Sequence, residues 1–405
     1  MTTETAGSNT KAHIETIAVH GGEFVDPATR SSSPNLVMSA TFAPSEIMGF
    51  SARTEEDYEG YTYARSGNPT VAQLEAKLAA MEGAEAARCY GSGIAASHAL
   101  IMGRLSAGDE AIFPESNYVG TAEFARDSLP RFGIKPSFVD LTSLDAAAEA
   151  ITPRTKMVWI ETPSNPTMQV FDIEALSRLA HSKGVRDVVV DSTFASPIAT
   201  RPMDLGADFV IHSLTKYIGG HGDAMGGAVL GRKKELDALN LEATVHYGGV
   251  LSPFNAWLII RGAATLPIRM RAHEEQALAV AKWLEAHPGV TRVYYPGLPS
   301  HPQHDLARRQ MKNFSGMITF RPKGPGPVIA ERMVKRLKHV HYAVSLGHHR
   351  SLIYWIGTDD LEASTFRHTP EAAERYKSLM GHGVFRLSVG IEHANDICCD
   401  LDQCF

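Results

Sequence analysis

The sequence predicts an α/β protein in which a large domain with a mostly parallel sheet precedes a smaller α+β domain. Between Gly83 and Leu230, short β-rich runs alternate with amphipathic helical stretches, as in parallel sheets with crossover helices. A long helical pattern begins at Ser252, and further strand-like runs follow Pro296. With 405 residues, of which 44% are hydrophobic and 21% charged, the chain can bury more than one core.

The elements of the large domain are predicted from hydrophobic periodicity. Runs of β-branched and apolar residues indicate strands, and apolar residues three or four apart indicate helices. The predicted strands are 111–114, 137–140, 157–161, 187–191, 209–212 and 228–230. Helices are predicted over 122–132, 144–151 and 173–183, and a further apolar helical pattern spans 94–105.

The rest of the chain is divided between an N-terminal arm and the second domain. Ser252 and Pro253 form a capping pair, and the helical pattern that follows continues towards His287 with a predicted kink near Pro267. Residues 1–60 lack strong periodicity and predict an extended arm that contributes to a neighbouring subunit. We therefore expect an arm over 1–60, a large α/β domain over 61–252 and an α+β domain over 253–405. In the last of these, strands are predicted over 316–320, 341–344 and 384–389, and helices over 328–336 and 370–379.

Composition disfavours several classes of function. The formal net charge is -6 and no concentrated basic face is visible, which argues against nucleic-acid and anionic-membrane partners. No apolar run is long enough to cross a bilayer, and the first residues lack the apolar region of a signal peptide. The four cysteines form no CxxC pair, and the 18 histidines show no metal-ligand spacing. These features predict a cytoplasmic, reduced protein without a metal site.

The first indication of chemistry is Lys216, in the run HSLTKY that begins at His212 and precedes a glycine-rich stretch. A lysine at the end of a strand, flanked by hydroxyls, can form an imine with an aldehyde cofactor whose phosphate those hydroxyls bind. This pattern points to pyridoxal phosphate. Because most lysines are solvated surface residues, the other motifs have to decide between the two interpretations.

Such a cofactor makes further demands on the sequence. Its phosphate needs backbone N–H groups at the start of a helix, which the run 91–94 can supply, and a guanidinium, which Arg65 can supply. A plain turn and a surface arginine are the alternatives. The pyridine nitrogen needs a carboxylate, and Asp191 ends an apolar run at the expected carboxyl edge of the sheet. A helix-capping aspartate is the alternative there.

Two more residues suit the ring and an amino-acid substrate. Tyr118 follows a predicted strand and can stack on the ring, although many tyrosines in such places only pack. Arg386 alternates with apolar neighbours as a half-buried strand residue does. An inward guanidinium demands an anion such as a substrate carboxylate, and a surface ion pair is the alternative.

Five ordered motifs give these residues a family context. They are YTYARSGNPT from Tyr61, ETPSNPTM from Glu161, VVVDSTFASP from Val188, HSLTKYIGGHGD from His212 and FRLSVGIE from Phe385. With them the chain, from about Thr41 to its C-terminus, resembles the pyridoxal-phosphate-dependent enzymes of cysteine and methionine metabolism. That group includes cystathionine γ-synthases and γ-lyases, methionine γ-lyases and O-acylhomoserine sulfhydrylases. The resemblance implies fold type I and a homotetramer of two dimers whose subunits share active sites.

The resemblance also implies a role for each site residue. Lys216, assisted by Tyr118, would be catalytic and would hold the cofactor as a Schiff base. Arg386 and Ser345 would bind the carboxylate of a small amino-acid substrate. The implied cofactor contacts are Gly93, Ile94, Ser213 and Thr215 at the phosphate, Tyr63 and Arg65 from the neighbouring subunit, Asn165 at the ring oxygen, Asp191 at the ring nitrogen and Tyr118 on the ring face.

The implied reaction is γ-elimination or γ-replacement on a homoserine- or methionine-like amino acid, with Lys216 moving protons at Cα and Cβ. Val344 stands where cystathionine enzymes commonly have a glutamate that meets a distal amino group, which resembles methionine γ-lyase. Gly120, in contrast, replaces the cysteine typical of methionine γ-lyase. The alternatives are a cystathionine γ-synthase, cystathionine γ-lyase or O-acylhomoserine sulfhydrylase proper, an aminotransferase or decarboxylase of the same fold, and a non-catalytic cofactor-binding regulator.

The segment 348–368, HHRSLIYWIGTDDLEASTFRH, departs from the family's usual sequence because it is longer, more aromatic and more acidic. One interpretation is a variable surface loop. The other is an altered wall of the substrate pocket, in which Asp359, Asp360 and Glu362 would favour a cationic substituent. A canavanine-type substrate, whose leaving group is guanidinooxy, would suit the second interpretation.

Overall fold

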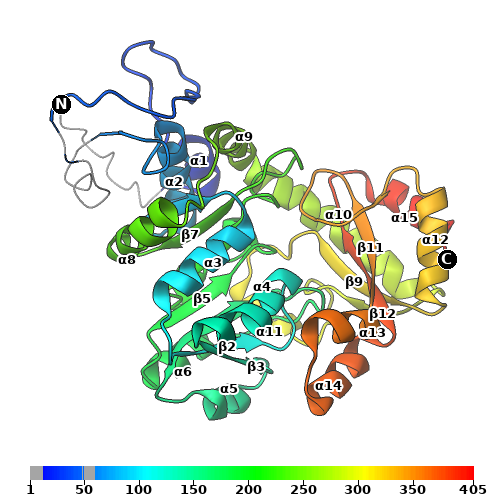
Figure 1. The fold of residues 1–405 in the computed structure, drawn as a ribbon. Helices are drawn as coiled ribbons and strands as arrows, with labels where there is room; N and C mark the ends of the chain where they lie inside the picture. The colour runs from blue at the N-terminus through cyan, green and yellow to red at the C-terminus, as the bar shows by residue number, and fades with distance from the viewer. Residues whose placement is uncertain (1–11, 48, 50–59) are drawn as a thin grey trace.

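Two β-sheets organise the computed structural model, which describes residues 12–47, 49 and 60–405 (Figure 1). The larger sheet has the strand order β1-β7-β6-β5-β4-β2-β3. Neighbouring strands are parallel except where β7 pairs with β1 and β6, so the predicted, mostly parallel sheet is confirmed. The strands are β1 (Ala86–Tyr90), β2 (Glu110–Pro114), β3 (Lys135–Val139), β4 (Thr155–Glu161), β5 (Asp187–Asp191), β6 (Phe209–Ser213) and β7 (Gly227–Gly231).

Helices cover both faces of this sheet because side chains alternate along each strand. In β5, Val189 packs with α3 (Gly93–Arg104), whereas Val188 and Val190 pack on the opposite face with α6 (Ile173–Ser182). The other helices of this part are α2 (Pro69–Glu82), α4 (Val119–Glu123), α5 (Leu144–Ala150), α7 (Ser196–Ala199) and α8 (Lys233–Leu239).

The carboxyl ends of the parallel strands meet at one edge, where β4 and β5 align Glu161 with Asp191, and β5 and β6 align Asp191 with Ile211. Polar residues that end these strands are thereby brought side by side. Ligands of open α/β sheets bind at this edge.

Two helices lead to the second sheet (Figure 1). α9 (Pro253–Ala264) and α10 (Leu266–Ala286) meet at Thr265, beside the predicted kink, because Pro267 lacks the N–H that a continuous helix would need. The second sheet has the order β10-β11-β12-β9-β8. Its strands are β8 (Val290–Tyr294), β9 (Met317–Pro322), β10 (His341–Tyr342), β11 (Leu352–Gly357) and β12 (Gly383–Ser388). The accompanying helices are α11 (His304–Gln310), α12 (Gly326–Arg336), α13 (Thr358–Leu361), α14 (Pro370–Met380) and α15 (Ala394–Asp402).

The weak periodicity of residues 1–60 predicts an extended arm, but part of this region is helical. α1 (Ile14–His20) packs against α2, α9 and α10. Lys77 fixes it, since Nζ donates hydrogen bonds of 2.7 and 3.0 Å to the carbonyl oxygens of Ala18 and Val19. Residues 1–11, 48 and 50–59 of the expected arm lie outside the described residues.

The segment 348–368 is not a surface loop, so that interpretation is wrong. Its first half contains β11, which lies between β10 and β12 in the second sheet and buries Ile353 completely. Its second half forms α13 and a π-helical turn over Glu362–Phe366. Within the part of the chain that the structure describes, no helix has both the length and the apolarity to span a membrane.

Candidate active site

Lys216 lies just beyond β6, and its amine meets the second domain. Nζ donates a hydrogen bond of 2.8 Å to Ser345 Oγ. Ser345 has φ +85°, a region costly for a residue with a side chain and frequent at functional sites. The loop that carries Ser345 also contains Gly347, which lies against the backbone at Lys216 and Tyr217. Only glycine allows this approach, since a Cβ at position 347 would lie 2.6 Å from the nitrogen of Tyr217. Burial, with a smaller contribution from the Arg386 charge, lowers the pKa of Lys216 to about 8.

Arg386, in β12, is a partly buried cation held by neutral oxygens. Nη1 donates to Asn165 Oδ1 at 3.0 Å, and Nη2 donates to the carbonyl oxygen of Ser345 at 3.2 Å. Burial lowers the pKa of Arg386 to about 10. Among the described residues, no carboxylate forms an ion pair with this guanidinium. The charges of Tyr118 and Glu161 offset part of the effect of burial on this pKa, but neither forms an ion pair with the guanidinium. A desolvated guanidinium with no direct ion-pair partner among the described residues favours an incoming anion.

Two buried carboxylates, Glu161 and Asp191, lie at the ends of β4 and β5. Glu161 accepts the N–H of Tyr118 at 2.7 Å through Oε2 and the N–H of Asn165 at 2.9 Å through Oε1. Burial raises the pKa of both carboxyls, and the Asp191 charge raises that of Glu161 further. Asp191 Oδ1 accepts the N–H of Thr193 at 3.0 Å. Glu161 thus holds the backbone of two predicted site residues.

An anion cradle forms where α3 begins. A Cβ on Gly93 would lie 2.8 Å from Ser213 Cβ and 2.9 Å from its Oγ, so only glycine allows this approach. Ser92 caps the helix by accepting the N–H of Ala95 at 3.1 Å. Thr215 Oγ1 accepts the N–H of Gly226 at 3.1 Å. The free N–H groups and dipole of a helix N-terminus, beside two hydroxyls, suit a phosphate.

Two functional candidates, Glu161 and the Glu82–His212 pair, were missed in the sequence. Glu161 ends an apolar strand as Asp191 does, and that signal could have identified it. His212 Nε2 lies 2.8 Å from Glu82 Oε2, with the two side chains 1% and 0% exposed. The charge of His212 favours ionisation of Asp191 and lowers its pKa against the effect of burial. Nothing local in the sequence links two residues so far apart.

The other predicted residues lie at the rim or farther away. Tyr118 is 43% exposed at the N-terminus of α4, and Val344 is 63% exposed beside Ser345. The Arg65 guanidinium lies 5.4 Å from the centroid of the Tyr63 ring, and Nη1 donates to the carbonyl oxygen of Val245 at 2.7 Å. Within the described residues of one chain, no hydrogen bond joins Tyr63 or Arg65 to Ser213 or Thr215, whose hydroxyls are predicted to bind the phosphate. Ile94, which follows Gly93, is 38% exposed.

These groups fit pyridoxal phosphate. The chain offers an amine with a lowered pKa, a buried carboxylate at the sheet edge and a phosphate cradle that a Cβ at Gly93 would fill. Residues 15–405 match the family described as Cys/Met metabolism PLP-dependent enzyme. The chain belongs to this family. The predicted cofactor and fold type are thereby confirmed.

Relatives within the family are similar over almost their whole length. Cystathionine gamma-synthase of Mycobacterium tuberculosis is 40% identical over 388 residues, which cover 96% of this chain and 95% of that protein. Canavanine gamma-lyase of Pseudomonas canavaninivorans is 40% identical over 389 residues, or 95% and 94% of the two chains. The solved structure of cystathionine gamma-lyase from Lactobacillus plantarum, complexed with L-serine, superposes with a TM-score of 0.86, 35% identity and coverage of 97% and 98%. These similarities confirm the prediction of an enzyme that eliminates or replaces a group at Cγ, as a class of reaction.

Among the described residues, the carboxylates of the segment 348–368 form no ion pair with Lys216 or Arg386, so the interpretation as an altered pocket wall stays a prediction. Glu362 Oε1 lies 2.6 Å from His368 Nδ1. Asp359 and Asp360 line a different pocket of about 620 Å³, together with Arg321, Lys323, Trp355 and His382. None of the site residues described above belongs to that pocket.

Proposed function

We propose that this enzyme binds a γ-substituted amino acid through the substrate carboxylate at Arg386, and that Lys216 carries the protons for elimination or replacement at Cγ. The observation that carries the proposal is the chain of contacts from Lys216 through Ser345 to Arg386 and Asn165. In it, the amine of lowered pKa and the Arg386 guanidinium, which has no ion-pair partner among the described residues, both contact Ser345. A substrate carboxylate held by Arg386 therefore brings Cα close to Lys216.

The residues divide the work as follows. Pyridoxal phosphate, when bound, supplies an aldehyde for covalent attachment and a ring that withdraws electrons from the substrate. Lys216 Nζ, whose pKa is lowered to about 8, would accept the Cα proton and return it to the conjugated system that the cofactor supplies. Neutral again, the amine would then accept a Cβ proton, after which the γ-substituent can leave. Tyr118 covers the ring. The assigned cofactor-binding groups are Asp191 at the ring nitrogen, Asn165 at the ring oxygen, and Gly93, Ile94, Ser213 and Thr215 at the phosphate.

For the substrate, we propose a γ-substituent that lacks a distal ammonium. Val344 is apolar and 63% exposed beside Ser345, so it offers no charge to such a group. A guanidinooxy leaving group is the first candidate, because the canavanine gamma-lyase of Pseudomonas canavaninivorans is as similar to this chain as the cystathionine gamma-synthases are. Synthesis of cystathionine from an O-acylhomoserine is the second candidate, on the same degree of similarity.

The test is turnover of canavanine, methionine, cystathionine, and O-succinylhomoserine with and without cysteine, followed by release of 2-oxo acid, thiol and homoserine. Lys216→Ala serves as the inactive control. We expect canavanine to be consumed with the highest kcat/KM, and Val344→Glu to shift preference towards cystathionine. Turnover of cystathionine alone by the unaltered enzyme would contradict the assignment of Val344.

We further propose a cytoplasmic homotetramer in which Tyr63 and Arg65 reach the phosphate of a neighbouring subunit. All four cysteines are free, which suits a reducing compartment. Tyr63 is 44% exposed, so its side chain is available for contact with a neighbouring subunit. Light scattering gives the assembly, and mixing inactive Lys216→Ala with inactive Arg65→Ala subunits should restore turnover if active sites are shared. No restoration in mixed oligomers would refute the sharing.

A further inference from the structure

We propose that the second half of the atypical segment 348–368, together with Arg375 of α14, positions Tyr118 for catalysis. The proposal rests on the role assigned to Tyr118 above. We call the contacts concerned the clasp: Thr365, Arg367, His368 and Arg375 on one side, and Glu115, Glu123, Arg126 and Asp127 on the other. The clasp joins the second domain to the chain on both sides of Tyr118.

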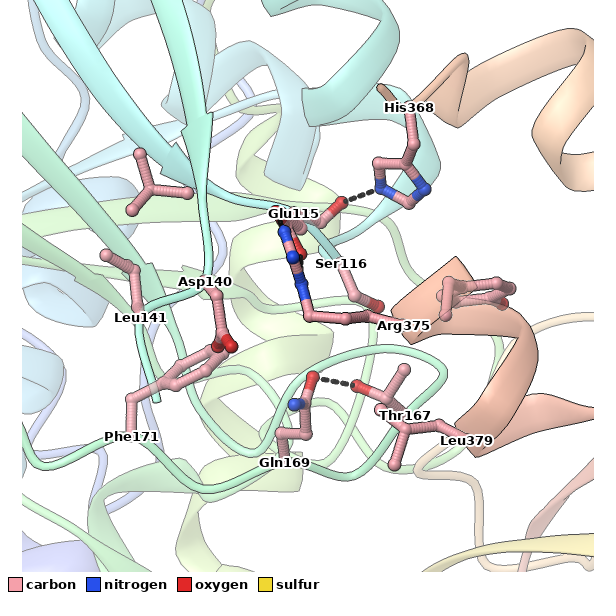
Figure 2. A pocket seen from close by; sticks show the side chains of 12 residues that line it. Glu115, Ser116, Asp140, Leu141, Thr167, Gln169, Phe171, His368, Arg375 and Leu379 are labelled. Atoms are coloured by element: carbon pink, nitrogen blue, oxygen red, sulfur yellow. Dashed lines mark hydrogen bonds and ion pairs between the residues drawn. The ribbon is translucent and has the colours of Figure 1, made fainter. Parts of the chain in front are cut away.

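The first half of the clasp holds Glu115, three residues before Tyr118. His368 Nε2 lies 2.9 Å from the carbonyl oxygen of Glu115, and its Nδ1 lies 2.6 Å from Glu362 Oε1. Arg375 forms an ion pair with the Glu115 carboxylate. Figure 2 shows both side chains directed towards Glu115 across a small pocket. The His368 side chain is only 1% exposed, so this contact is shielded from water.

The second half of the clasp holds the helical turns that follow Tyr118. Thr365 Oγ1 donates to Glu123 Oε1 at 2.7 Å, and its carbonyl oxygen accepts from Arg126 Nη1 at 3.3 Å. Arg367 pairs with Asp127 at 2.6 Å. The backbone is therefore held by the second domain at residue 115 and again at residues 123–127.

Tyr118 itself depends on this backbone. Its N–H donates to Glu161, and its ring lies against Gly120, where a Cβ would be 2.7 Å from the ring's Cε1. Tyr118 is 43% exposed, so a large part of it faces solvent. Its position therefore follows the backbone from 115 to 127, which the clasp ties to the domain that carries Ser345 and Arg386. Loosening the clasp should misplace Tyr118 relative to the substrate while the phosphate cradle, built on β6 and α3, stays intact.

Thr365→Val and Asp127→Asn test this inference, because each removes one contact with little change of volume. Arg309→Ala is the matched control: Arg309, on α11, pairs at 2.5 Å with Asp172, so it joins the same two parts of the chain away from Tyr118. Each change is made in the unaltered holoenzyme and in a Tyr118→Ala background. The readouts are kcat, KM, the melting temperature and the visible circular dichroism of the bound cofactor.

We expect Thr365→Val to lower kcat about 3- to 10-fold and to change the dichroism band in the unaltered enzyme, but to lower kcat less than about 2-fold in Tyr118→Ala. The melting temperature should fall equally in both backgrounds, and Arg309→Ala should leave kcat unchanged. If Thr365→Val lowered kcat equally in both backgrounds, or if Arg309→Ala lowered kcat as much as Thr365→Val does, the inference about the clasp would be overturned. The proposed function would be unaffected by either result. If Tyr118→Ala changes neither turnover nor the dichroism band, the role assigned to Tyr118 fails, and the inference fails with it.

Discussion

Replacement of Gly93 by alanine tests the phosphate cradle most sharply. The new Cβ would lie 2.8 Å from Ser213 Cβ, so the two atoms must separate by about 0.6 Å to reach ordinary contact at 3.4 Å. Ser213 resists this movement because it pairs with Gly227 in the sheet and its N–H donates to Thr193 Oγ1 at 2.9 Å. The start of α3 must therefore move away from the Ser213 hydroxyl.

The magnitude follows from the hydrogen bonds that such a movement breaks. One hydrogen bond to a charged phosphate contributes about 1.5–3 kcal/mol, so its loss weakens cofactor binding about 10- to 150-fold. The Kd is measured by titrating apoenzyme with pyridoxal phosphate and following absorbance and tryptophan fluorescence. Adding Ser213→Gly removes the clashing atoms, so the double variant should bind no worse than Gly93→Ala. Gly103→Ala, on the same helix α3 as Gly93, is the control, because its Cβ would meet only the flexible side chain of Leu239 in α8. An unchanged Kd in Gly93→Ala would refute the assignment of the cradle.

Three further predictions concern the reacting groups. The neutral amine of Lys216 is the nucleophile and its pKa is about 8, so the rate of cofactor attachment to apoenzyme, measured by stopped-flow absorbance, should reach half of its maximum near pH 8 and level off about one pH unit higher; a rise that continues beyond pH 10 would contradict this pKa. Glu161→Gln leaves one N–H of Tyr118 or Asn165 without its acceptor, and steady-state kinetics should show kcat about 10-fold lower; an unchanged kcat would remove Glu161 from the site. Arg386→Lys replaces a guanidinium, which can bind a carboxylate through two N–H groups, by a single ammonium, and should raise KM about 10-fold or more with an unchanged cofactor spectrum. An altered spectrum with normal KM would place Arg386 at the cofactor instead.

Much of the large sheet was predictable because its strands are continuous apolar runs that a buried parallel sheet requires. Asp191, for example, ends the run 188–190 and lies at the expected edge. β1 was missed because Ala86–Tyr90 contains no β-branched residue, although it pairs along its whole length with β7. β11 was missed for a different reason: the β-rich run 352–356 was present, but the segment was judged by its departure from the family pattern.

The site was predictable where residues act near their own strand ends, and not where they act through distant partners. Lys216 is close to Ser213 and Thr215 in the sequence, so the motif alone brings them together. Contacts such as Lys216–Ser345 join different domains, and only the resemblance to a family indicated them. No family motif indicated the contacts of the clasp. Charged residues in a variable segment predict a solvated surface unless their partners are known.

The central claim is that the amine of Lys216 attaches pyridoxal phosphate. The most direct measurement is borohydride reduction of the holoenzyme, followed by proteolysis and mass spectrometry of the labelled peptides. We expect a single pyridoxyl group on the peptide that contains Lys216, and no label in Lys216→Ala. A label on another lysine, or an unlabelled Lys216 in protein that has been incubated with the cofactor, would contradict it.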